Sequence, residues 1–318
     1  LSNSSIHLKM VYTKSVGNVS LDDLEIFSTP NNPNGKIITY FTKPVDTTVG
    51  FVPHAKQLNQ TMDDTLIEYI NRSAYTLDIA VYNFAQNGNL SSIVSAVNNA
   101  FNRGVVIRWI YNGTSTNSGI LQLNPAIQTL VSPTTSSYGL MHNKFMIVDA
   151  NSPDPTQSLV WTGSMNWEDQ SVNSDYNNVV IVQDKHLAKA YTREFNQLWG
   201  GAGPIPDITL SRFGPTKFEN NIHRFIIGGR TVDLYFSPAQ NVNAHIITSI
   251  NSASADLYFG IYAFTSANIA SAIRSGIQNG IYTAGIMDQF CIPYAADDTL
   301  VPVMGNLLKI YSLSNLYH

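Results

Sequence analysis

The spacing of hydrophobic residues predicts alternating helices and strands. Residues 62–74 and 90–103 carry apolar side chains at helical spacing, so each segment predicts a helix with one buried face. The two stripes consist of Leu66, Ile67, Ile70 and Ala74, and of Leu90, Ile93, Val94, Val97 and Phe101. Residues 77–84 are almost continuously apolar, which is typical of a strand covered on both faces. Gly104 ends the second helix, and a further strand follows at residues 105–111.

Three more strands and a long helix follow in the middle of the chain. The strands are expected at FMIVD (145–149), SLVWTG (158–163) and NVVIVQ (178–183). Residues 185–199 predict a helix that ends at Gly200 and Gly201. Its inward side chains are Leu187, Tyr191, Phe195, Leu198 and Trp199. This alternation predicts an α/β fold in which a mixed sheet is flanked by helices.

The chain also contains an internal repeat. Asn71, Tyr82 and Phe84 recur at an offset of 180 as Asn251, Tyr262 and Phe264, and Tyr40–Phe41 matches Tyr235–Phe236 at an offset of 195. From Ser95 onward the offset is 176, which matches Asn112 with Asp288 and His142 with His318. A period this long indicates a duplicated domain rather than a solenoid.

The repeat divides the chain into four expected segments. Residues 1–30 belong to neither copy and are interpreted as the tail of a preceding segment. Residues 31–200 form the first copy, 201–230 a connector rich in Gly and Pro, and 231–318 a second copy that is incomplete at its C-terminal end. We expect the natural polypeptide to continue beyond His318, with a lysine two residues later, an aspartate seven residues later and then a G-S-x-N segment.

Composition narrows the class of protein. The 318 residues are 44% hydrophobic, enough to bury two ordinary cores, and nothing in the sequence approaches a transmembrane span. Charged residues are only 13% and the formal net charge is −4, so no global basic field attracts nucleic acid or an anionic membrane. The single cysteine, Cys291, excludes an internal disulfide framework and a cysteine-based zinc site. A surface rich in Asn, Ser, Thr and Tyr leads us to expect a secreted or cell-surface bacterial protein.

The candidate chemistry is concentrated between residues 142 and 166. His142 and Lys144 are two apart on an expected strand and therefore share a face, whereas Asp149 is an odd number of residues away, which suits an orienting carboxylate. Ser164 and Asn166 are again two apart and offer a hydroxyl and an amide. Together these side chains form an anion site that contains one titratable nucleophile.

A phosphodiester needs this set of groups. Attack by an imidazole nitrogen passes through a more negatively charged transition state, which a lysine and neutral donors stabilise when they are already in place. A covalent intermediate divides one difficult displacement into two easier ones. The leaving alkoxide also needs a proton, which a second imidazole on the far side of the phosphorus can supply. A histidine from each copy, placed where the copies meet, would satisfy this geometry.

The pattern H-x-K-x4-D at His142, Lys144 and Asp149, followed by G-S-x-N at residues 163–166, resembles the signature of the phospholipase D superfamily. The resemblance covers roughly residue 38 to the end. It implies two pseudo-symmetric α/β halves with one active site at their interface, a phosphohistidine intermediate, no metal and no cofactor.

The resemblance also implies a role for each matching residue. His142 is the expected nucleophile, and Lys144 and Asn166 bind phosphate. Ser164 supports them, and Asp149 orients the site. His318 is the general acid and base of the second copy, and the two histidines could exchange roles.

The sequence departs from the family pattern in two places. Family members often have a glutamate downstream of G-S-x-N that holds a catalytic imidazole, and Asn177 stands at the matching position here. The lysine, aspartate and G-S-x-N of the second copy are absent from the sequence, which ends at His318.

Three functions stay open at this point. The first is a secreted phosphodiesterase that acts on phospholipid headgroups, with the remainder of its own polypeptide beyond His318 as a partner. The second is a metal-independent nuclease of the same superfamily, although repeated phosphate contacts would call for more Lys and Arg than this chain has. The third is a non-catalytic module that uses the fold for binding or assembly. Low charge favours lipids or small diesters over nucleic acid.

Overall fold

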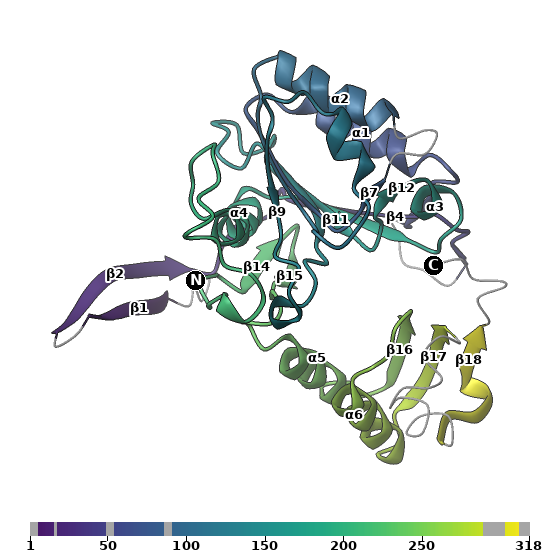
Figure 1. The fold of residues 1–318 in the computed structure, drawn as a ribbon. Coiled ribbons are helices and arrows are strands. Elements are labelled where there is room, and N and C mark those ends of the chain that lie inside the picture. Colours follow the sequence, from purple (N-terminus) through teal and green to yellow (C-terminus); the bar gives the residue numbers. More distant parts are fainter. Residues whose placement is uncertain (1–5, 16–17, 49–53, 86–90, 289–302, 312–318) are drawn as a thin grey trace.

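The structure is a computed structural model that describes residues 6–15, 18–48, 54–85, 91–288 and 303–311. Its main feature is an eight-stranded sheet with the spatial order β5-β4-β13-β11-β10-β6-β8-β9 (Figure 1). The strands are β4 (Lys36–Phe41), β5 (Lys56–Gln57), β6 (Thr76–Val81), β8 (Val106–Tyr111), β9 (Gln128–Val131), β10 (Lys144–Val148), β11 (Leu159–Gly163) and β13 (Asn178–Gln183). Strands β6, β8 and β9 are parallel, whereas β10 runs antiparallel to both of its neighbours, β6 and β11. The predicted mixed α/β fold is confirmed.

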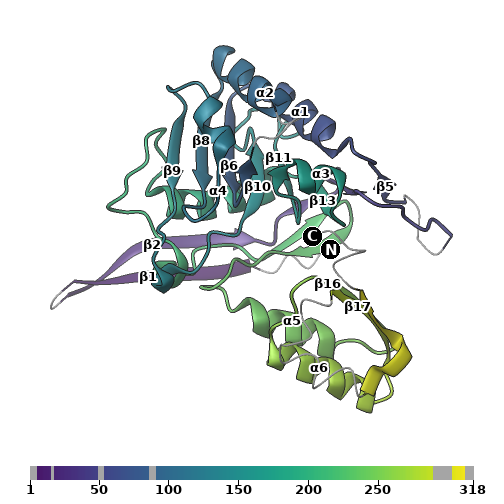
Figure 2. The ribbon, with the colours of Figure 1, turned by 45° about the vertical axis from the view of Figure 1, so that its right-hand side comes forward.

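Helices cover both faces of this sheet. Helices α1 (Met62–Arg72) and α2 (Ser91–Asn102) lie together on one face, and α4 (Lys185–Trp199) packs on the other (Figures 1 and 2). The first helix ends two residues before Ala74, which is exposed. The five inward residues predicted for α4 are all buried. Asp184 caps this helix, because its Oδ1 accepts a hydrogen bond from the backbone N–H of Leu187 at 2.7 Å.

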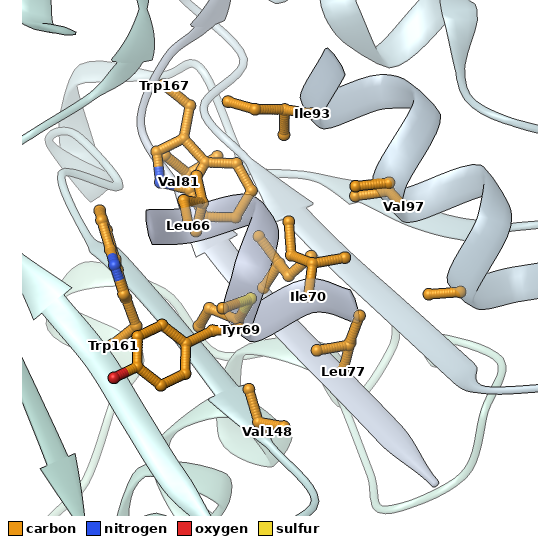
Figure 3. Close-up of a cluster of buried hydrophobic side chains, with 14 of the residues drawn as sticks. Leu66, Tyr69, Ile70, Leu77, Val81, Ile93, Val97, Val148, Trp161 and Trp167 are labelled. Carbon is orange, nitrogen blue, oxygen red and sulfur yellow. The ribbon is translucent and has the colours of Figure 1, made fainter. Parts of the chain in front are cut away.

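Two hydrophobic clusters fill the space between the sheet and its helices. On β6, Ile79 and Val81 belong to the cluster under α1 and α2, while Ala80 belongs to the cluster under α4. Met146 and Phe145 of β10 divide in the same way. Figure 3 shows the first cluster, in which large side chains such as Trp161 and Trp167 lie beside the helix residues. The expectation that 77–84 contains a strand covered on both faces is therefore confirmed for β6.

Smaller elements surround the main sheet. Strands β1 (Ile6–Ser15) and β2 (Asn18–Ser28) form an antiparallel ladder, and β7 (Phe84–Ala85) pairs with β12 (Trp167–Glu168), which leads into α3 (Asp169–Asn173). Strands β3 (Asn31–Asn32), β14 (Arg224–Ile227) and β15 (Arg230–Asp233) form a small sheet. Short 3₁₀ turns occur at Ser118–Gln122, Ser136–Tyr138, Gly214–Thr216 and Gly305–Leu307. Phe225, Ile227, Leu234 and Phe236 join the cluster under α4, so this part of the expected connector and of the second copy packs against the first.

The C-terminal elements repeat the order of the N-terminal ones. They are α5 (Val242–Asn251), β16 (Asp256–Ile261), α6 (Ala267–Gln278), β17 (Tyr282–Asp288) and β18 (Leu308–Tyr311), with all three strands parallel. Thr76 pairs with Val106 in the first unit and Asp256 pairs with Tyr282 in the second, which reproduces the offsets of 180 and 176. The second unit has its own small core, which includes Phe264, Ile273 and Met287. The repeat is therefore visible in strand register, while a two-fold relation between complete halves stays a prediction.

The pairing of β18 tests the alignment that matches His142 with His318. Trp109 pairs with Thr129 in the first unit, and Gly285 pairs with Leu308 in the second, so the offset has grown to 179 at this strand. A match between His142 and His318 then requires the loop after β18 to be three residues shorter than the loop after β9. His318 lies outside the described residues, and its assignment stays a prediction. Within the described part of the chain, none of the helices has the length and hydrophobicity needed to cross a bilayer.

Candidate active site

The motif residues gather at one edge of the eight-stranded sheet. Lys144 begins β10 and pairs with Val81, the last residue of β6. On the other side of β10, Phe145 pairs with Thr162, so Ser164 follows at the same edge. Asn177 stands immediately before β13, which is the next strand. Antiparallel pairing thus brings together residues that the sequence separates, because the start of one strand lies beside the end of its neighbour.

Lys144 is a buried cation at the centre of this edge. Only 8% of the residue is exposed, and its Nζ donates a hydrogen bond to the backbone carbonyl of His142 at 3.2 Å. The same ammonium lies over the ring of Tyr82, 5.1 Å from its centroid. Burial lowers the pKa of Lys144 to about 8, while the negative charge of Glu168 acts in the opposite direction. Lys144 is therefore still protonated at neutral pH.

His142 stands beside this lysine with its imidazole packed edge-on against the ring of Tyr82, at a centroid distance of 4.7 Å. Partial burial of the imidazole and the positive charge of Lys144 lower the pKa of His142 to about 4. The residue as a whole is nevertheless exposed, so solvent moderates this shift, and its direction carries the conclusion. At neutral pH the imidazole is uncharged, which is the form that can attack an electrophile.

Ser164 is tied to the start of β13. Its Oγ donates to Oδ1 of Asn177 at 2.8 Å and accepts from the backbone N–H of Asn178 at 3.0 Å. Gly163 allows this approach, because a Cβ at that position would lie 2.2 Å from the carbonyl oxygen of Asn178. The serine therefore fixes the G-S-x-N loop to the start of β13, and its supporting role in phosphate binding stays a prediction.

Asn166 presents an amide at the same loop. Its Oδ1 is buried without a hydrogen-bond partner among the described residues. The next residue, Trp167, is fully buried and holds the loop down through its backbone N–H, which donates to the carbonyl of Asn83 at 3.0 Å. This oxygen can only accept a hydrogen bond, so contact with an anion would have to come from the Nδ2 group of the same amide.

Asp149 has a different environment from the other motif residues. It lies after the far end of β10 and is completely buried. Its Oδ1 accepts from the backbone N–H groups of Tyr75 and Thr76, both at 2.8 Å, and its Oδ2 accepts from that of Ala74 at 2.9 Å. The carboxylate thus fixes the turn from α1 into β6. These contacts are structural, and a role of Asp149 in orienting the site stays a prediction.

Three further residues belong to this edge and were not recognised from the sequence as functional. Tyr82 and Asn83 follow β6 directly, and Glu168 lies two residues after Asn166. Asn83 Nδ2 donates a hydrogen bond to Glu168 Oε2. The signal that could have found Glu168 is the alternation of Ser164, Asn166 and Glu168, since residues two apart on extended backbone share a face.

A cavity of about 550 Å³ opens beside His142. Its walls include Tyr138, Met141, Phe213 and Lys217. The ammonium of Lys217 lies 2.5 Å from Oε1 of the buried Glu194, so its charge is neutralised within the protein. The space next to the imidazole is therefore half apolar and carries little net charge. Among the described residues there is also no cluster of three or more His, Cys, Asp or Glu side chains that could hold a metal ion.

Comparison with known proteins identifies a family for the central part of the chain. The family model for "Cardiolipin synthase, PLD-like domain" matches residues 66–199, which contain the whole H-x-K-x4-D and G-S-x-N region. Residues 66–199 of the chain thus form a domain of the phospholipase D superfamily. The chain is similar to the mitochondrial cardiolipin hydrolases of Drosophila melanogaster, with 29% identity over 42% of this chain and 57% of that protein, and of Xenopus tropicalis, with 30% identity over 42% and 59%. The chain thus spans somewhat more than half of the length of these relatives.

A solved structure supports the fold over a longer stretch. The phosphatidylserine synthase of Haemophilus influenzae superposes with a TM-score of 0.53 at 11% identity, over 72% of this chain and 60% of that chain. At this identity the likeness concerns the fold alone. It extends the similarity beyond the segment matched by the family model.

The relatives correct one expectation from composition. The curated proteins that match are eukaryotic and mitochondrial by name, so the expectation of a secreted or cell-surface bacterial protein was wrong. The physical reason is that uncharged polar side chains hydrate a protein surface equally well in any compartment. A surface rich in Asn, Ser and Thr therefore does not report where a protein resides.

Proposed function

We propose that the protein is a phosphodiester hydrolase that acts on phospholipid headgroups through a phosphohistidine intermediate. The observation that carries this proposal is the uncharged imidazole of His142 beside the buried, protonated ammonium of Lys144. A neutral nucleophile and a fixed cation are the two groups that attack on an anionic phosphorus requires. The mechanism and the substrate rest on this pairing and on the similarity to cardiolipin hydrolases.

The proposed reaction has two displacements. An imidazole nitrogen of His142 forms a bond to phosphorus while the bond from phosphorus to the leaving oxygen breaks, and that oxygen takes a proton from a general acid. In the second step the same group removes a proton from water, the water oxygen attacks phosphorus, and the bond to His142 breaks to release the phosphomonoester. Lys144 and Asn166 hold the non-bridging oxygens in both steps. His318 is proposed as the general acid and base.

The substrate is proposed from the cavity beside His142. A phospholipid places an uncharged glycerol and ester region next to its diester, which fits a half-apolar wall with a neutralised lysine. A nucleic acid instead places further phosphates on both sides of the scissile one, and these require additional free cations. The names of the curated relatives point to a diester lipid of the cardiolipin type. Lipid is therefore favoured over nucleic acid.

The mechanism is tested by trapping the intermediate. The full-length natural protein is quenched during turnover of a diester lipid, digested, and examined by mass spectrometry for an acid-labile phosphoryl adduct. An adduct on the peptide that contains His142 is expected, and it should be absent in His142→Ala. An adduct on the peptide that contains His318 would reverse the two roles. No adduct, under conditions that trap a control enzyme of the superfamily, would indicate direct attack by water and overturn the proposal.

A matched histidine provides the control. His186 is exposed on the first turn of α4, and His186→Ala removes an imidazole without touching the site. It should retain activity, whereas His142→Ala should lower turnover by about three decades or more. The substrate is tested by comparing kcat/KM for an acyl-bearing phospholipid with that for a dinucleotide. A preference for the dinucleotide would contradict the lipid assignment and leave the phosphohistidine test unaffected.

A further inference from the structure

Glu168 is held rigidly beside the phosphate site by two neighbouring segments. It ends β12, whose residues Trp167 and Glu168 pair with Phe84 and Ala85 of β7. Asn83 Nδ2 donates to Oε2 of Glu168, and the Oγ of Ser171 lies 3.2 Å from Oε1. The carboxylate is therefore restrained at both oxygens, on the loop that also carries Asn166.

The same contacts connect Glu168 to His142 and Lys144. Asn83 directly follows Tyr82, and the ring of Tyr82 lies against both the imidazole of His142 and the ammonium of Lys144. The backbone N–H of Tyr82 donates to the carbonyl of Asn143, which stands between those two residues, at 2.8 Å. A displacement of Asn83 would therefore move the aromatic wall on which the nucleophile and the cation rest.

The charges around Lys144 are unequal. His142, at the start of its own strand, is uncharged at neutral pH, and Tyr82 from the end of β6 contributes only its ring. Asn177, across the sheet edge, is neutral, and its Oδ1 is occupied by Ser164. The carboxylate of Glu168 on β12 supplies the negative charge that raises the pKa of Lys144. Two further carboxylates lie farther along the chain. Asp169 begins α3, and Oδ2 of Asp175 lies 3.2 Å from the Oγ of Ser171.

We propose that Glu168 is a positioning residue of the phosphate site, which keeps the buried ammonium of Lys144 charged and, through Asn83 and Tyr82, in place. This inference rests on the proposed function in assigning phosphate as the ligand of Lys144. A buried lysine without a nearby negative charge tends to lose its proton, and a neutral amine binds phosphate weakly. Glu168 touches neither phosphorus nor the leaving group in this role.

The inference is tested by titrating Lys144 directly, without turnover. The full-length protein is labelled with lysine carrying ¹³C at the ε position, and the Lys144 signal is assigned by its loss in Lys144→Arg. In Glu168→Gln, which keeps an oxygen able to accept from Asn83 but removes the charge, the pKa of Lys144 should fall by about one unit or more. Asp64→Asn removes an exposed carboxylate from α1 and should leave the titration unchanged.

Binding of inorganic phosphate, measured by calorimetry, provides the second readout. Glu168→Gln should bind phosphate several-fold more weakly at pH 8 than at pH 6, a larger difference than the native protein shows. The double variant Glu168→Gln with Lys144→Arg should lose this excess pH dependence, because a guanidinium does not deprotonate in this range. A lysine titration that is unchanged in Glu168→Gln would overturn the inference.

A further variant keeps the test decisive if Glu168→Gln does not fold. Glu168→Asp retains the charge but shortens the reach to Asn83, and it should preserve most of the native pKa of Lys144. If the pKa of Lys144 in Glu168→Asp instead fell by about one unit or more, a role for the charge of residue 168 would be contradicted. A protein in which Lys144 titrates as expected but no diester is hydrolysed would instead refute the proposed function and leave the role of Glu168 standing.

Discussion

The ammonium of Lys144 lies 5.1 Å from the centre of the Tyr82 ring, where the start of β10 meets the end of β6. The contact joins two residues that are 62 positions apart in the sequence. The face of the aromatic ring attracts the cation and so adds to the negative charge of Glu168, which opposes the loss of the proton from a lysine that is only 8% exposed. The same ring packs against His142, so one tyrosine positions both groups of the proposed reaction.

The dependence of the hydrolysis rate on pH should be bell-shaped. His142 must be neutral to attack, and its pKa is lowered toward about 4, so the acidic limb should lie below the ordinary histidine pKa of 6.5. Lys144 must be charged, and its pKa is about 8, so the alkaline fall should begin no higher than about pH 8. Measurement of kcat/KM across this range checks both limits. An acidic limb at the ordinary histidine value of 6.5 would contradict the assignment of His142.

Replacing Lys144 with methionine should abolish activity and increase stability. Lowering the pKa of Lys144 from 10.5 to about 8 corresponds to a penalty of about 3 kcal/mol for keeping the charge in the folded protein. The unfolded state binds this proton more tightly, so the penalty is fully present below pH 8 and disappears as pH rises above 10.5. Lys144→Met should therefore raise the free energy of unfolding by ~1–3 kcal/mol at pH 7.

Urea unfolding at pH 7 and at high pH measures this effect. The exposed Lys36 on β4 provides a matched control, and Lys36→Met should change stability by less than ~0.5 kcal/mol. A loss of stability in Lys144→Met would show that packing of the lysine stem outweighs the cost of its charge.

Asp149→Asn should destabilise the fold by ~2–4 kcal/mol. The buried carboxylate accepts three backbone N–H bonds from residues 74–76, and an asparagine must turn its own N–H₂ group toward at least one of these donors. Because the turn leads into β6, the loss should spread to the whole sheet. Chemical denaturation monitored by tryptophan fluorescence would measure it. A variant with native stability but no turnover would instead indicate a direct role in the reaction.

Activity should survive strong chelators. In the proposed mechanism the positive charge that stabilises the transition state comes from Lys144, and the nucleophile is an imidazole rather than a metal-bound hydroxide. Hydrolysis of a diester lipid should proceed at the same rate before and after dialysis against EDTA. A loss of activity that a divalent cation restores would contradict this mechanism.

Local patterns in the sequence determined most of the first unit. Apolar spacing predicted α1, α2 and α4 and the buried strands β6, β8, β10, β11 and β13, because burial of one helix face or of both strand faces leaves a clear periodic signature. Strand β4, which lies between β13 and β5, and the four-residue edge strand β9 were not predicted. The motif identified His142, Lys144, Ser164 and Asn166, since the spacing of two on extended backbone places side chains on a common face.

Tertiary structure alone decided how these residues act. Which strands lie next to each other depends on packing across the sheet and not on local sequence, and this order places Tyr82, Asn83 and Glu168 around Lys144. The pKa values of His142 and Lys144 likewise depend on burial and on charges that are distant in the chain. Composition determined even less, because a polar surface is compatible with any compartment. The sequence by itself thus named the groups proposed to react, and the fold set their charge and their neighbours.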